Sequence, residues 1–564
     1  MHQYSELLRT ILEKRGITTL KEADIFLNPD YVRDLHNPFN MKDMEKACVK
    51  LFEVIESKEK SVIYADYDCD GIPGAVILQD LFKKIGYTNY EVYIPGRNDE
   101  GYGLNLGAIE QFAKNKIKLL ITIDLGITAV SEVAQAEVDE IEVIIMDHHL
   151  PHRQAGLPHE ILPKAYAILN PKIDNYEDKM LCGAGVVFKF VQGFLKKYGE
   201  FYKIKEGWEK WLLDMAGMAT LSDLVPLVGE NRAIAYYGMK VLKKSPRLGL
   251  QKLLAKMNID QRYLTEDDLG FMVVPKINAA SRMDNPMRAF ELLSTDDEKE
   301  AGILADHLSK INDERKTIVT SIMREVNKKF GESSILETKE VIVIGNPKWR
   351  VGVLGLVAGK IMDEYQKPVF VWGRDENNCI KGSCRSDGSV SIVELMTHSS
   401  DYFLDFGGHE LAGGFTVHNE KIHFLEEALV KSFIEIKKEK TENEIVYDVR
   451  TDLSAVNMKN WKELEKLAPF GLGNPKPIFL FENVNIENIK KFGKNGSGEH
   501  LEITVSDQSI SNYKNKIKAV AFFSNEESFK TILEVNKKVN LLAVFDLSRF
   551  RGREELRLRI EEIF

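Results

Sequence analysis

Four short apolar runs recur between residues 61 and 146, each separated from the next by a stretch with helical character. They span residues 61–65, 90–94, 118–123 and 141–146. Apolar strands that alternate with helices at this spacing form βαβ units, in which neighbouring strands run parallel. This alternation constrains the fold more than any other feature of the chain. It predicts an α/β fold with a parallel sheet.

Three of these runs are followed directly by an aspartate, namely Asp66, Asp124 and Asp147. In an open parallel sheet ligands bind at the carboxyl ends of the strands, so the three side chains are expected to meet at one edge. A single aspartate in this position is compatible with an ordinary helix cap. Three together, with His148 and His149 next to the third, predict a metal site.

The first of these aspartates opens the stretch Asp66-Tyr67-Asp68-Cys69-Asp70-Gly71. Carboxylates at alternate positions repel one another, and a divalent metal between them is the usual remedy. A polar Asp-Gly turn is the simpler alternative. An EF-hand loop would place a glutamate at its twelfth position, whereas this chain continues as a helix over 71–78. Asp223, shortly before Pro226, is either a further ligand or an acidic residue of that turn.

The composition limits the classes of protein. A length of 564 residues exceeds one hydrophobic core and predicts three or four domains. Hydrophobic content of 44% and charged content of 29% are those of a soluble globular protein. We find neither a signal-peptide pattern nor an apolar span of about 18 residues, and expect a cytoplasmic protein. Five scattered cysteines argue against disulfides and structural zinc. A net charge of −10 does not exclude nucleic acid, because carboxylates around metals are compatible with a local basic groove.

The second half of the chain contains two groups of residues typical of a phosphate pocket. Ser383, Arg385 and Ser386 combine a guanidinium with hydroxyls, and glycines surround His409 over 407–414. Backbone N–H groups and a guanidinium are the parts from which such pockets are built. Either group alone is also compatible with a generic turn.

Two regions flank this pocket in the sequence. A charged helical pattern over about 295–330 predicts a solvated strut roughly 50 Å long that bridges two domains. From about residue 441, apolar runs without a dominant helical pattern predict a small barrel or sandwich. Basic and aromatic residues are interleaved near its end, over 549–559. This pattern suits single-stranded nucleic acid, and a solvated strand face is the alternative.

In their order along the chain, the acidic motifs resemble those of the DHH phosphoesterase superfamily. The glycine-histidine stretch 407–414 resembles the signature of its DHHA1 partner domain. With 278–282, 383–386 and 469–477, the chain is similar over about residues 50–564 to the bacterial members that degrade single-stranded DNA. The acidic motifs are Asp68-x-Asp70-Gly71, Asp124-x-Gly126, Asp147-His148-His149 and Asp223.

The resemblance implies an α/β architecture with a C-terminal barrel. A parallel-sheet DHH domain and a smaller α/β DHHA1 domain are joined by a long helix, and a β-barrel of the OB-fold type follows. The expected boundaries are 1–50 for an N-terminal helical extension, 51–295 for the DHH domain, 296–330 for the connecting helix, 331–440 for the DHHA1 domain and 441–564 for the nucleic-acid-binding OB-fold.

The resemblance also implies two metal ions, Mn²⁺ or Mg²⁺, at the junction of the first two domains. Asp124 is expected to bridge them, and Asp66 to tune the site without being a ligand. Asp147 is expected to orient His148, and His149 to face the scissile phosphate; with Asp124, Asp147 and His149 form the expected catalytic set. The implied metal ligands are Asp68, Asp70, Asp124, His148 and Asp223.

Substrate contacts follow from the same resemblance. Arg282, Ser383 and Arg385 match positions that grip a terminal 5′ phosphate, and His409 is expected to contact the phosphodiester backbone. Among the departures from the family pattern are Tyr64, where many relatives carry a histidine, and Arg350, which follows a tryptophan in place of a histidine. The full set of implied substrate contacts is Asn278, Arg282, Ser383, Arg385, Ser386, Gly408 and His409.

The implied function is metal-dependent hydrolysis of single-stranded DNA from the 5′ end to 5′-mononucleotides, in DNA repair and recombination. Expected partners are single-stranded DNA, single-strand-binding protein and a RecQ-type helicase, with a monomeric chain and no membrane. Two alternatives stay open. One is a DHH-type phosphodiesterase acting on oligoribonucleotides or cyclic dinucleotides, which has no need of a third domain. The other is a non-catalytic replication scaffold, against which the intact set of implied ligands argues.

Overall fold

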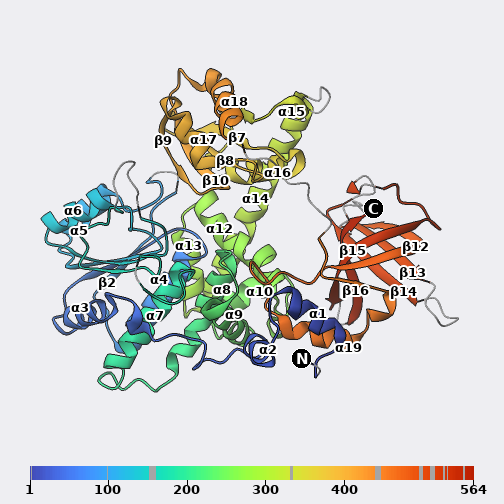
Figure 1. Ribbon diagram of the computed structural model, residues 1–564. Helices are drawn as coiled ribbons and strands as arrows, with labels where there is room; N and C mark the ends of the chain where they lie inside the picture. Colours follow the sequence, from blue (N-terminus) through green and yellow to red (C-terminus); the bar gives the residue numbers. More distant parts are fainter. Residues whose placement is uncertain are drawn as a thin grey trace. The chain divides into compact units, whose positions relative to one another are not determined.

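Figure 1 shows the computed structural model of the protein, whose chain divides into two compact units. The barrel unit consists of Met1–Leu35, Pro226–Tyr236 and Glu442–Phe564, and the two-sheet unit of His36–Val225 and Tyr237–Thr441. The centre of the arginine-rich stretch predicted near the end of the chain, 550–552, lies outside the described residues. The structure describes residues 1, 3–97, 100–151, 160–173, 175–330, 335–437, 446–493, 500–507, 515–524, 528–529, 531–549 and 553–564.

The two-sheet unit begins with the predicted parallel sheet. Its strands follow the spatial order β2-β1-β3-β4-β5, and all neighbouring pairs are parallel. Ala65 lies beside Ile123, and Ile123 beside Met146, so β1, β3 and β4 end level with one another. An aspartate follows each of these three ends. The strands are β1 (Ser61–Ala65), β2 (Tyr90–Tyr93), β3 (Leu119–Ile123), β4 (Glu142–Met146) and β5 (Ala167–Leu169).

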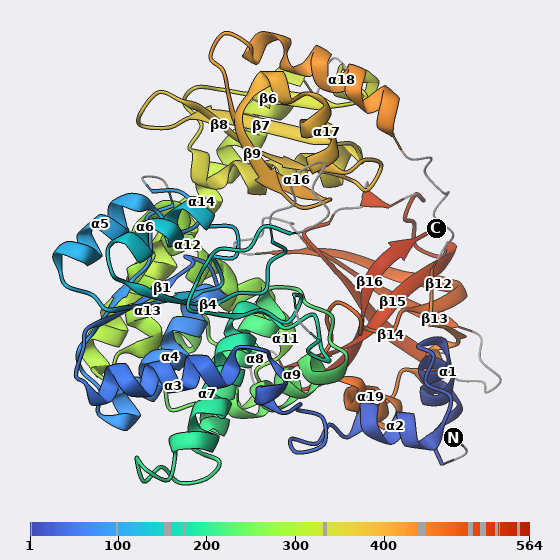
Figure 2. The same ribbon diagram turned by 60° about the vertical axis from the view of Figure 1, so that its left-hand side comes forward.

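Helices cover both faces of this sheet (Figure 2). Alternate strand residues such as Val62 and Leu120 share a hydrophobic core with α5 and α6 on one face. On the other face, a Cβ at Gly74 of α4 would lie 2.6 Å from Ile123 Cγ2, so glycine allows this helix to pack close to the sheet. α7 packs beside α4, and α3 beside α7. The helices are α3 (Met44–Glu56), α4 (Gly71–Ile85), α5 (Leu106–Lys114), α6 (Val130–Val138) and α7 (Gly183–Tyr198).

A helical region follows and leads into the long helix α14 (Glu298–Phe330), which at 1.5 Å per residue is about 50 Å long. Its residues Ala301, Leu304, Ala305 and Leu308 are buried. Their spacing forms one apolar face, and the helix packs there against α10, α12 and α13. The expectation of a solvated strut is therefore wrong, because one face of the helix is buried against these three helices. The preceding helices are α8 (Leu213–Ser222), α9 (Gly229–Leu242), α10 (Leu248–Lys256), α11 (Glu266–Asp268), α12 (Val274–Met283) and α13 (Met287–Ser294).

The second sheet of this unit has the order β6-β7-β8-β10-β9, in which β6 and β7 are parallel and the other neighbours antiparallel. α16 packs against β7 and β8, whereas α17 and α18 share a hydrophobic core with Phe370, Ile380 and Phe415. The short α15 precedes this sheet in the chain. The elements are α15 (Ile335–Thr338), β6 (Ile342–Gly345), α16 (Leu354–Tyr365), β7 (Val369–Arg374), β8 (Ile380–Arg385), α17 (Ile392–His398), β9 (Phe403–Gly408), β10 (Ala412–Val417) and α18 (Leu425–Ile436).

The barrel unit contains a closed β-barrel, and not the sandwich that the sequence left open. Its strands follow the order β11-β12-β13-β14-β16-β15, and β15 also pairs with β12, which closes the ring. Closure removes the exposed sheet edges that a sandwich would keep. The strands are β11 (Val449–Thr451), β12 (Phe479–Phe492), β13 (His500–Asp507), β14 (Asn515–Phe522), β15 (Lys538–Ser548) and β16 (Glu555–Ile563), with α19 (Met458–Leu464) between the first two.

The N-terminal helices α1 (Glu6–Lys14) and α2 (Leu20–Leu27) belong to this barrel unit. Leu8 and Leu12 are buried in one hydrophobic core with barrel residues such as Phe479. The expectation of a separate extension over 1–50 therefore differs from the structure, which joins the first residues of the chain to the last and assigns α3 to the other unit. Within the described residues, no helix is both long and apolar enough to cross a membrane.

Candidate metal centre and anion pocket

The turn between β1 and α4 carries three of the acidic residues. Asp68 Oδ1 accepts hydrogen bonds from the backbone N–H groups of Asp70 (2.8 Å) and Gly71 (3.3 Å), which closes the turn as the helix begins. A Cβ at Gly71 would lie 2.4 Å from the backbone oxygen of Asp66, so glycine is needed for this close return of the chain. The turn thereby keeps all three carboxylates near the edge of the sheet.

Asp70 is buried at the N-terminus of α7. Its carboxylate accepts hydrogen bonds from the backbone N–H groups of Gly183 (2.6 Å) and Ala184 (2.7 Å), which are unsatisfied groups of a helix start. Burial and the charge of Asp68 nevertheless raise the pKa of Asp70 to about 6. A cation beside Asp70 would remove the energetic cost of its charge.

Asp124 follows β3 with a left-handed backbone, φ 61°. A Cβ at Gly183 would lie 2.6 Å from the Cβ of Asp124, so a glycine at the start of α7 makes room for the aspartate. Asp124 is buried, and its Oδ1 has no hydrogen-bond partner in the described part of the chain. A buried, unsatisfied carboxylate oxygen on a strained backbone is typical of a ligand-binding position.

Asp147 holds the ring of His149. Its Oδ1 lies 2.8 Å from His149 Nδ1 and accepts the backbone N–H of His148, and its Oδ2 accepts the backbone N–H of Ile127. Burial acts to raise the pKa of Asp147, but the hydrogen bond and charge of His149 lower it to about 2. Burial likewise acts to lower the pKa of His149, and Asp147 raises it to about 9. The prediction that Asp147 orients the ring of His148 is wrong, because Asp147 meets His148 through the backbone.

The ring of His148 lies among three carboxylates instead. Its Nε2 is 3.2 Å from Asp124 Oδ1 and 3.7 Å from both Asp70 Oδ2 and Asp223 Oδ2. Asp223 is the C-cap residue of α8. Burial and the charge of His149 lower the pKa of His148 to about 3, so its ring is neutral at pH 7 and has a lone pair for a metal. Among the described residues neither ring nitrogen of His148 has a hydrogen-bond partner.

These side chains form three overlapping groups whose ligand atoms lie within 4.8 Å of one another. Burial and neighbouring carboxylates raise the pKa of Asp124 well above its usual range and that of Asp223 to about 8. Such carboxylates ionise together readily only around a cation, and oxygen ligands with imidazole suit Mn²⁺ or Mg²⁺. The residues therefore fit divalent metals. The groups, which together we call the acidic set, are Asp66, Asp68 and Asp124; Asp70, His148 and Asp223; and Asp124, His148 and His149.

Asp66 is thus part of the acidic set, although it was predicted to tune the site without being a ligand. Its Oδ1 is buried and, among the described residues, lacks a hydrogen-bond partner. The sequence already indicated this membership, because Asp66 and Asp68 occupy alternate positions of one tight turn. Tyr64 faces the other side of the sheet, where its hydroxyl donates to Gly103 O (3.0 Å) and accepts from Asn105 Nδ2 (3.1 Å). The departure at position 64 therefore lies outside the acidic groups.

Four arginines interact beside the acidic set, and we call them the arginine cluster: Arg97, Arg282, Arg315 and Arg385. Burial, and then the charges of the other three, lower the pKa of Arg282 to about 9. Arg97 Cζ lies 5.1 Å from the ring centroid of Tyr67, and Arg97 also interacts with Asp66. Guanidinium groups that face one another are stable together when an anion lies between them, and phosphate matches their geometry.

The N-terminus of α16 adjoins this cluster. A Cβ at Gly355 would lie 3.1 Å from Arg385 Nη2 and 3.5 Å from Ser383 Oγ, so both side chains reach the first turn of the helix. Helix N-termini favour anions. Arg282 Nη1 donates to Gly352 O (3.2 Å), which ties α12 to the same place. The structure therefore brings Arg282, Ser383 and Arg385 together, and their contact with a phosphate stays a prediction.

Two other predicted substrate contacts have different surroundings. Ser386 is buried, and its hydroxyl donates to Val390 O (2.6 Å) and accepts the backbone N–H of Gly388 (3.1 Å). The hydroxyl stabilises the turn after β8, and the assignment of Ser386 to the substrate stays a prediction. Asn278 lies one turn before Arg282 in α12, and its buried Oδ1 lacks a partner among the described residues. Asn278 stays a candidate.

His409 approaches the acidic set from the turn between β9 and β10. A Cβ at Gly408 would lie 2.3 Å from Ala412 O, so this tight turn needs a glycine there. The ring of His409 stacks on that of His149, with centroids 6.1 Å apart and planes inclined by 12°. The second sheet thus supplies a histidine to the site at the edge of the first.

Arg97 and Tyr102 were not predicted from the sequence as residues of the site. Tyr102 is 55% exposed, and its ring centroid lies 6.2 Å from that of His149 and 6.4 Å from that of Tyr67. Both residues lie in the segment after β2. The rule that ligands gather at the carboxyl ends of parallel strands applies to β2 as it does to its neighbours, and would have found them.

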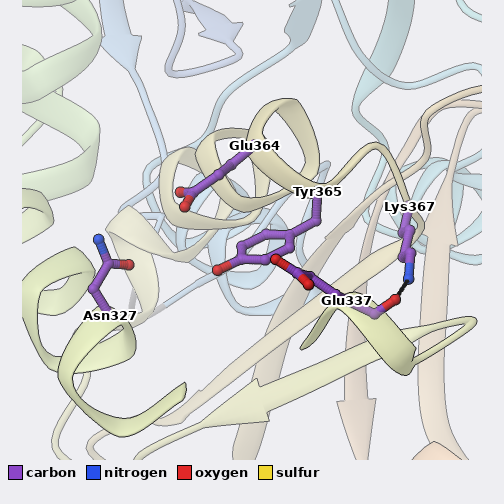
Figure 3. Close-up of a pocket in the computed structure, with 5 residues that line it drawn as sticks. All are labelled: Asn327, Glu337, Glu364, Tyr365 and Lys367. Carbon is purple, nitrogen blue, oxygen red and sulfur yellow. Dashed lines mark hydrogen bonds between the residues drawn. The ribbon is translucent and has the colours of Figure 1, made fainter. Parts of the chain in front are cut away.

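A surface cavity of about 490 Å³ lies apart from this chemistry. Figure 3 shows Glu364 and Tyr365 of α16 and Asn327 of α14 around it, with Lys367 donating to the backbone oxygen of Glu337. This polar pocket is lined by none of the residues of the acidic set or the arginine cluster. We assign it no part in the site.

Three family models match the chain, each over a different segment. The DHH family, N-terminal domain, matches residues 60–220. The DHHA1 domain matches residues 338–436. The RecJ OB domain matches residues 447–562. The acidic set lies at the sheet edge of the first segment, and His409 and Arg385 lie in the second.

Full-length comparisons agree with these segments. The single-stranded-DNA-specific exonuclease RecJ of Bacillus subtilis is 31% identical over 99% of this chain and 67% of that protein. The crystal structure of RecJ from Thermus thermophilus in complex with Mn²⁺ superposes with a TM-score of 0.80 at 22% identity, over 100% of this chain and 76% of that one. A crystal structure of exonuclease RecJ bound to manganese gives a TM-score of 0.60 at 26% identity, over 71% of this chain and 96% of that one.

Proposed function

Because the chain belongs to the RecJ family of single-stranded-DNA-specific exonucleases, we propose that it hydrolyses single-stranded DNA from the 5′ end to 5′-mononucleotides with two divalent cations. One observation carries the proposal. A set of carboxylates and histidines that fits metals lies directly beside the arginine cluster, which fits a phosphate. A metal centre beside a phosphate pocket is what an end-specific phosphodiesterase needs.

The cations, Mn²⁺ or Mg²⁺, are proposed to be held by Asp68, Asp70, Asp124, His148 and Asp223, with Asp66 added by its place in the same set. Bound there, two such ions lower the pKa of a water and neutralise charge that develops on the phosphate. Asp124 belongs to two of the three ligand groups and is the proposed bridge. The manganese bound to the related exonuclease supports a divalent cation as the cofactor.

The protein's own side chains orient the scissile phosphate. His149, held by Asp147 in a positively charged state, stacks with His409, so the two rings offer N–H donors from two sheets. Tyr102 presents an exposed ring beside His149 and suits stacking against a nucleobase. These groups fix a single strand by its phosphate and base.

The arginine cluster is proposed to bind the terminal 5′ phosphate. Cleavage of the bond between phosphorus and the 3′ oxygen releases a 5′-mononucleotide and leaves a new 5′ phosphate on the shortened strand. The same pocket then fits the new end. Recognition of the end by Arg282, Ser383 and Arg385 therefore explains both polarity and stepwise degradation.

The barrel is proposed to hold the strand through an aromatic patch formed by Phe492, His500, Phe522 and Phe523. The ring of His500 lies 5.1 Å from that of Phe492 and 4.8 Å from that of Phe523, which is 84% exposed. Arg557 lies over Phe522. Exposed rings with adjacent guanidinium groups suit single-stranded nucleic acid because every base has a stacking face.

Replacing Phe523 with alanine is expected to weaken binding of a long single strand by about 5- to 100-fold, since one base–aromatic stack contributes about 1–3 kcal/mol. Fluorescence anisotropy with labelled oligonucleotides measures the change. Phe424→Ala is the matched control, because Phe424 is also exposed but lies in the two-sheet unit. Equal affinities of wild type and Phe523→Ala would refute the aromatic patch.

Product analysis tests the function itself. Single-stranded DNA labelled at the 5′ or 3′ end is incubated with Mn²⁺ or Mg²⁺, and we expect 5′ label to appear first as mononucleotide while 3′ label stays on shortening strands. Release of the 3′ label as mononucleotide before the 5′ label would contradict the polarity. Faster turnover of a dinucleotide than of a long strand would favour the smaller-substrate phosphodiesterase instead.

The setting of this activity is a proposal as well. We propose a monomeric cytoplasmic enzyme of DNA repair and recombination that works with single-strand-binding protein and a RecQ-type helicase. The substrate itself supports these partners, since single strands arise when a helicase separates a duplex and are bound by such proteins.

A further inference from the structure

Lys172 follows β5, the last strand at the edge where the acidic set gathers. Asn170, which is fully buried, donates from Nδ2 to His149 O (2.9 Å), and its Oδ1 accepts the backbone N–H of Lys172 (2.9 Å). One side chain therefore fixes the chain at His149 and at Lys172 together. This places Lys172 at the metal centre although neither the motifs nor the roles assigned above include it.

The ammonium of Lys172 interacts with three carboxylates of the site: Asp223, Asp147 and Asp124. Burial lowers the pKa of Lys172, and these carboxylates act to raise it. Its charge is also felt at His148 and at His409, which approaches from the second sheet. Lys172 is therefore a partly buried cation whose charge interacts with the metal ligands and with both of these histidines.

The formal charges show what such a cation contributes. Asp147 is balanced by His149, and the five aspartates of the ligand groups carry five negative charges against four on two divalent cations. The scissile phosphodiester adds one more negative charge. Apart from the arginine cluster, whose Arg97 interacts with Asp66, this leaves a negative remainder where the substrate phosphate enters, and Lys172 cancels that remainder.

We infer that Lys172 is a phosphate-binding residue of the reaction, which donates from its ammonium to the scissile phosphodiester on the side of Asp223. This inference rests on the proposed function and adds to it a residue that selects an anionic linkage at that position. The competing role is that of a counter-ion, in which Lys172 only balances the carboxylates while the metals are absent.

The experiment compares Lys172→Met and Lys172→Arg with wild type. The control is Lys164→Met, because Lys164 is exposed and precedes β5 at the opposite end of the strand. A 5′-phosphorylated single strand is degraded at saturating Mn²⁺, and kcat and KM are measured. We expect Lys172→Met to lower kcat/KM by about 10- to 100-fold, as for the loss of a hydrogen bond to a charged group, and Lys172→Arg to restore most of it.

A binding measurement without turnover separates the two roles. A strand with a neutral methylphosphonate at its first linkage and an unmodified strand are bound to each variant with Ca²⁺ in place of Mn²⁺, so that cations neutralise the carboxylates while turnover is suppressed. The ratio of the two Kd values is expected to change by about tenfold between wild type and Lys172→Met, because the ammonium acts on the charge of that linkage. Lys164→Met should keep the ratio of the wild type.

Two results would overturn the inference. In one, Lys172→Met reaches the wild-type kcat/KM at saturating Mn²⁺ and changes only the Mn²⁺ concentration for half-maximal rate, which is the behaviour of a counter-ion. In the other, the ratio of Kd values is unchanged. If wild type itself fails to degrade single-stranded DNA, the proposed function is wrong, and this outcome is distinct from both.

Discussion

Asp124→Asn is expected to lower the rate of degradation of 5′-phosphorylated single-stranded DNA in Mn²⁺ by at least about 10³-fold. Each tenfold in rate corresponds to about 1.4 kcal/mol of activation free energy, and metal stabilisation of the phosphate contributes several times that amount. Asp124 joins two of the ligand groups, and its buried Oδ1 lacks a partner among the described residues. Asparagine keeps the size of the side chain and removes its charge. The rate of mononucleotide release measures the effect.

The control for this variant is Asp363→Asn, because Asp363 is exposed on α16. It should degrade DNA at the wild-type rate. Calorimetric titration of Mn²⁺ provides a second readout, in which Asp124→Asn binds the ions more weakly at an unchanged far-UV circular dichroism spectrum. A variant that retains both the wild-type rate and the wild-type Mn²⁺ affinity would exclude Asp124 as a metal ligand.

Arg385→Ala should remove the preference for a phosphorylated 5′ end. The guanidinium and the Ser383 hydroxyl both reach the first turn of α16, and the guanidinium interacts with Arg282. A hydrogen bond to a charged group contributes about 1.5–3 kcal/mol, so kcat/KM for a 5′-phosphorylated strand is expected to fall by about 10- to 100-fold. The value for the same strand with a 5′ hydroxyl should change little.

Competition between the two strands in one reaction measures this preference directly. Arg385→Lys keeps the charge but loses the bidentate geometry, so an intermediate preference is expected. Arg288→Ala is the control, since Arg288 is exposed on α13 and pairs with Glu291 (2.9 Å). An unchanged ratio of rates in Arg385→Ala would show that another group reads the end.

The sequence alone determined the parallel sheet and most of the acidic set. Apolar runs that alternate with helices give βαβ units, and strand ends at one edge of a parallel sheet bring Asp66, Asp124 and Asp147 together whatever the details of packing. Both rules depend on local periodicity and chain direction, which are readable without knowledge of distant contacts. The strand order of the barrel depends on contacts between distant segments, so it was not predicted from the sequence. The sequence also left open whether the strands form a closed barrel or a sandwich.

Only the tertiary structure decided which atoms meet. Two adjacent histidines follow Asp147 in the chain, and the backbone after β4 determines that its carboxylate holds the ring of His149 and leaves His148 to the acidic set. The arginine cluster draws on segments after β2, in α12, in α14 and at the end of β8, and the barrel core takes in α1 from the other end of the chain. Such contacts depend on how separate elements pack, and periodicity along the chain carries no information about that packing.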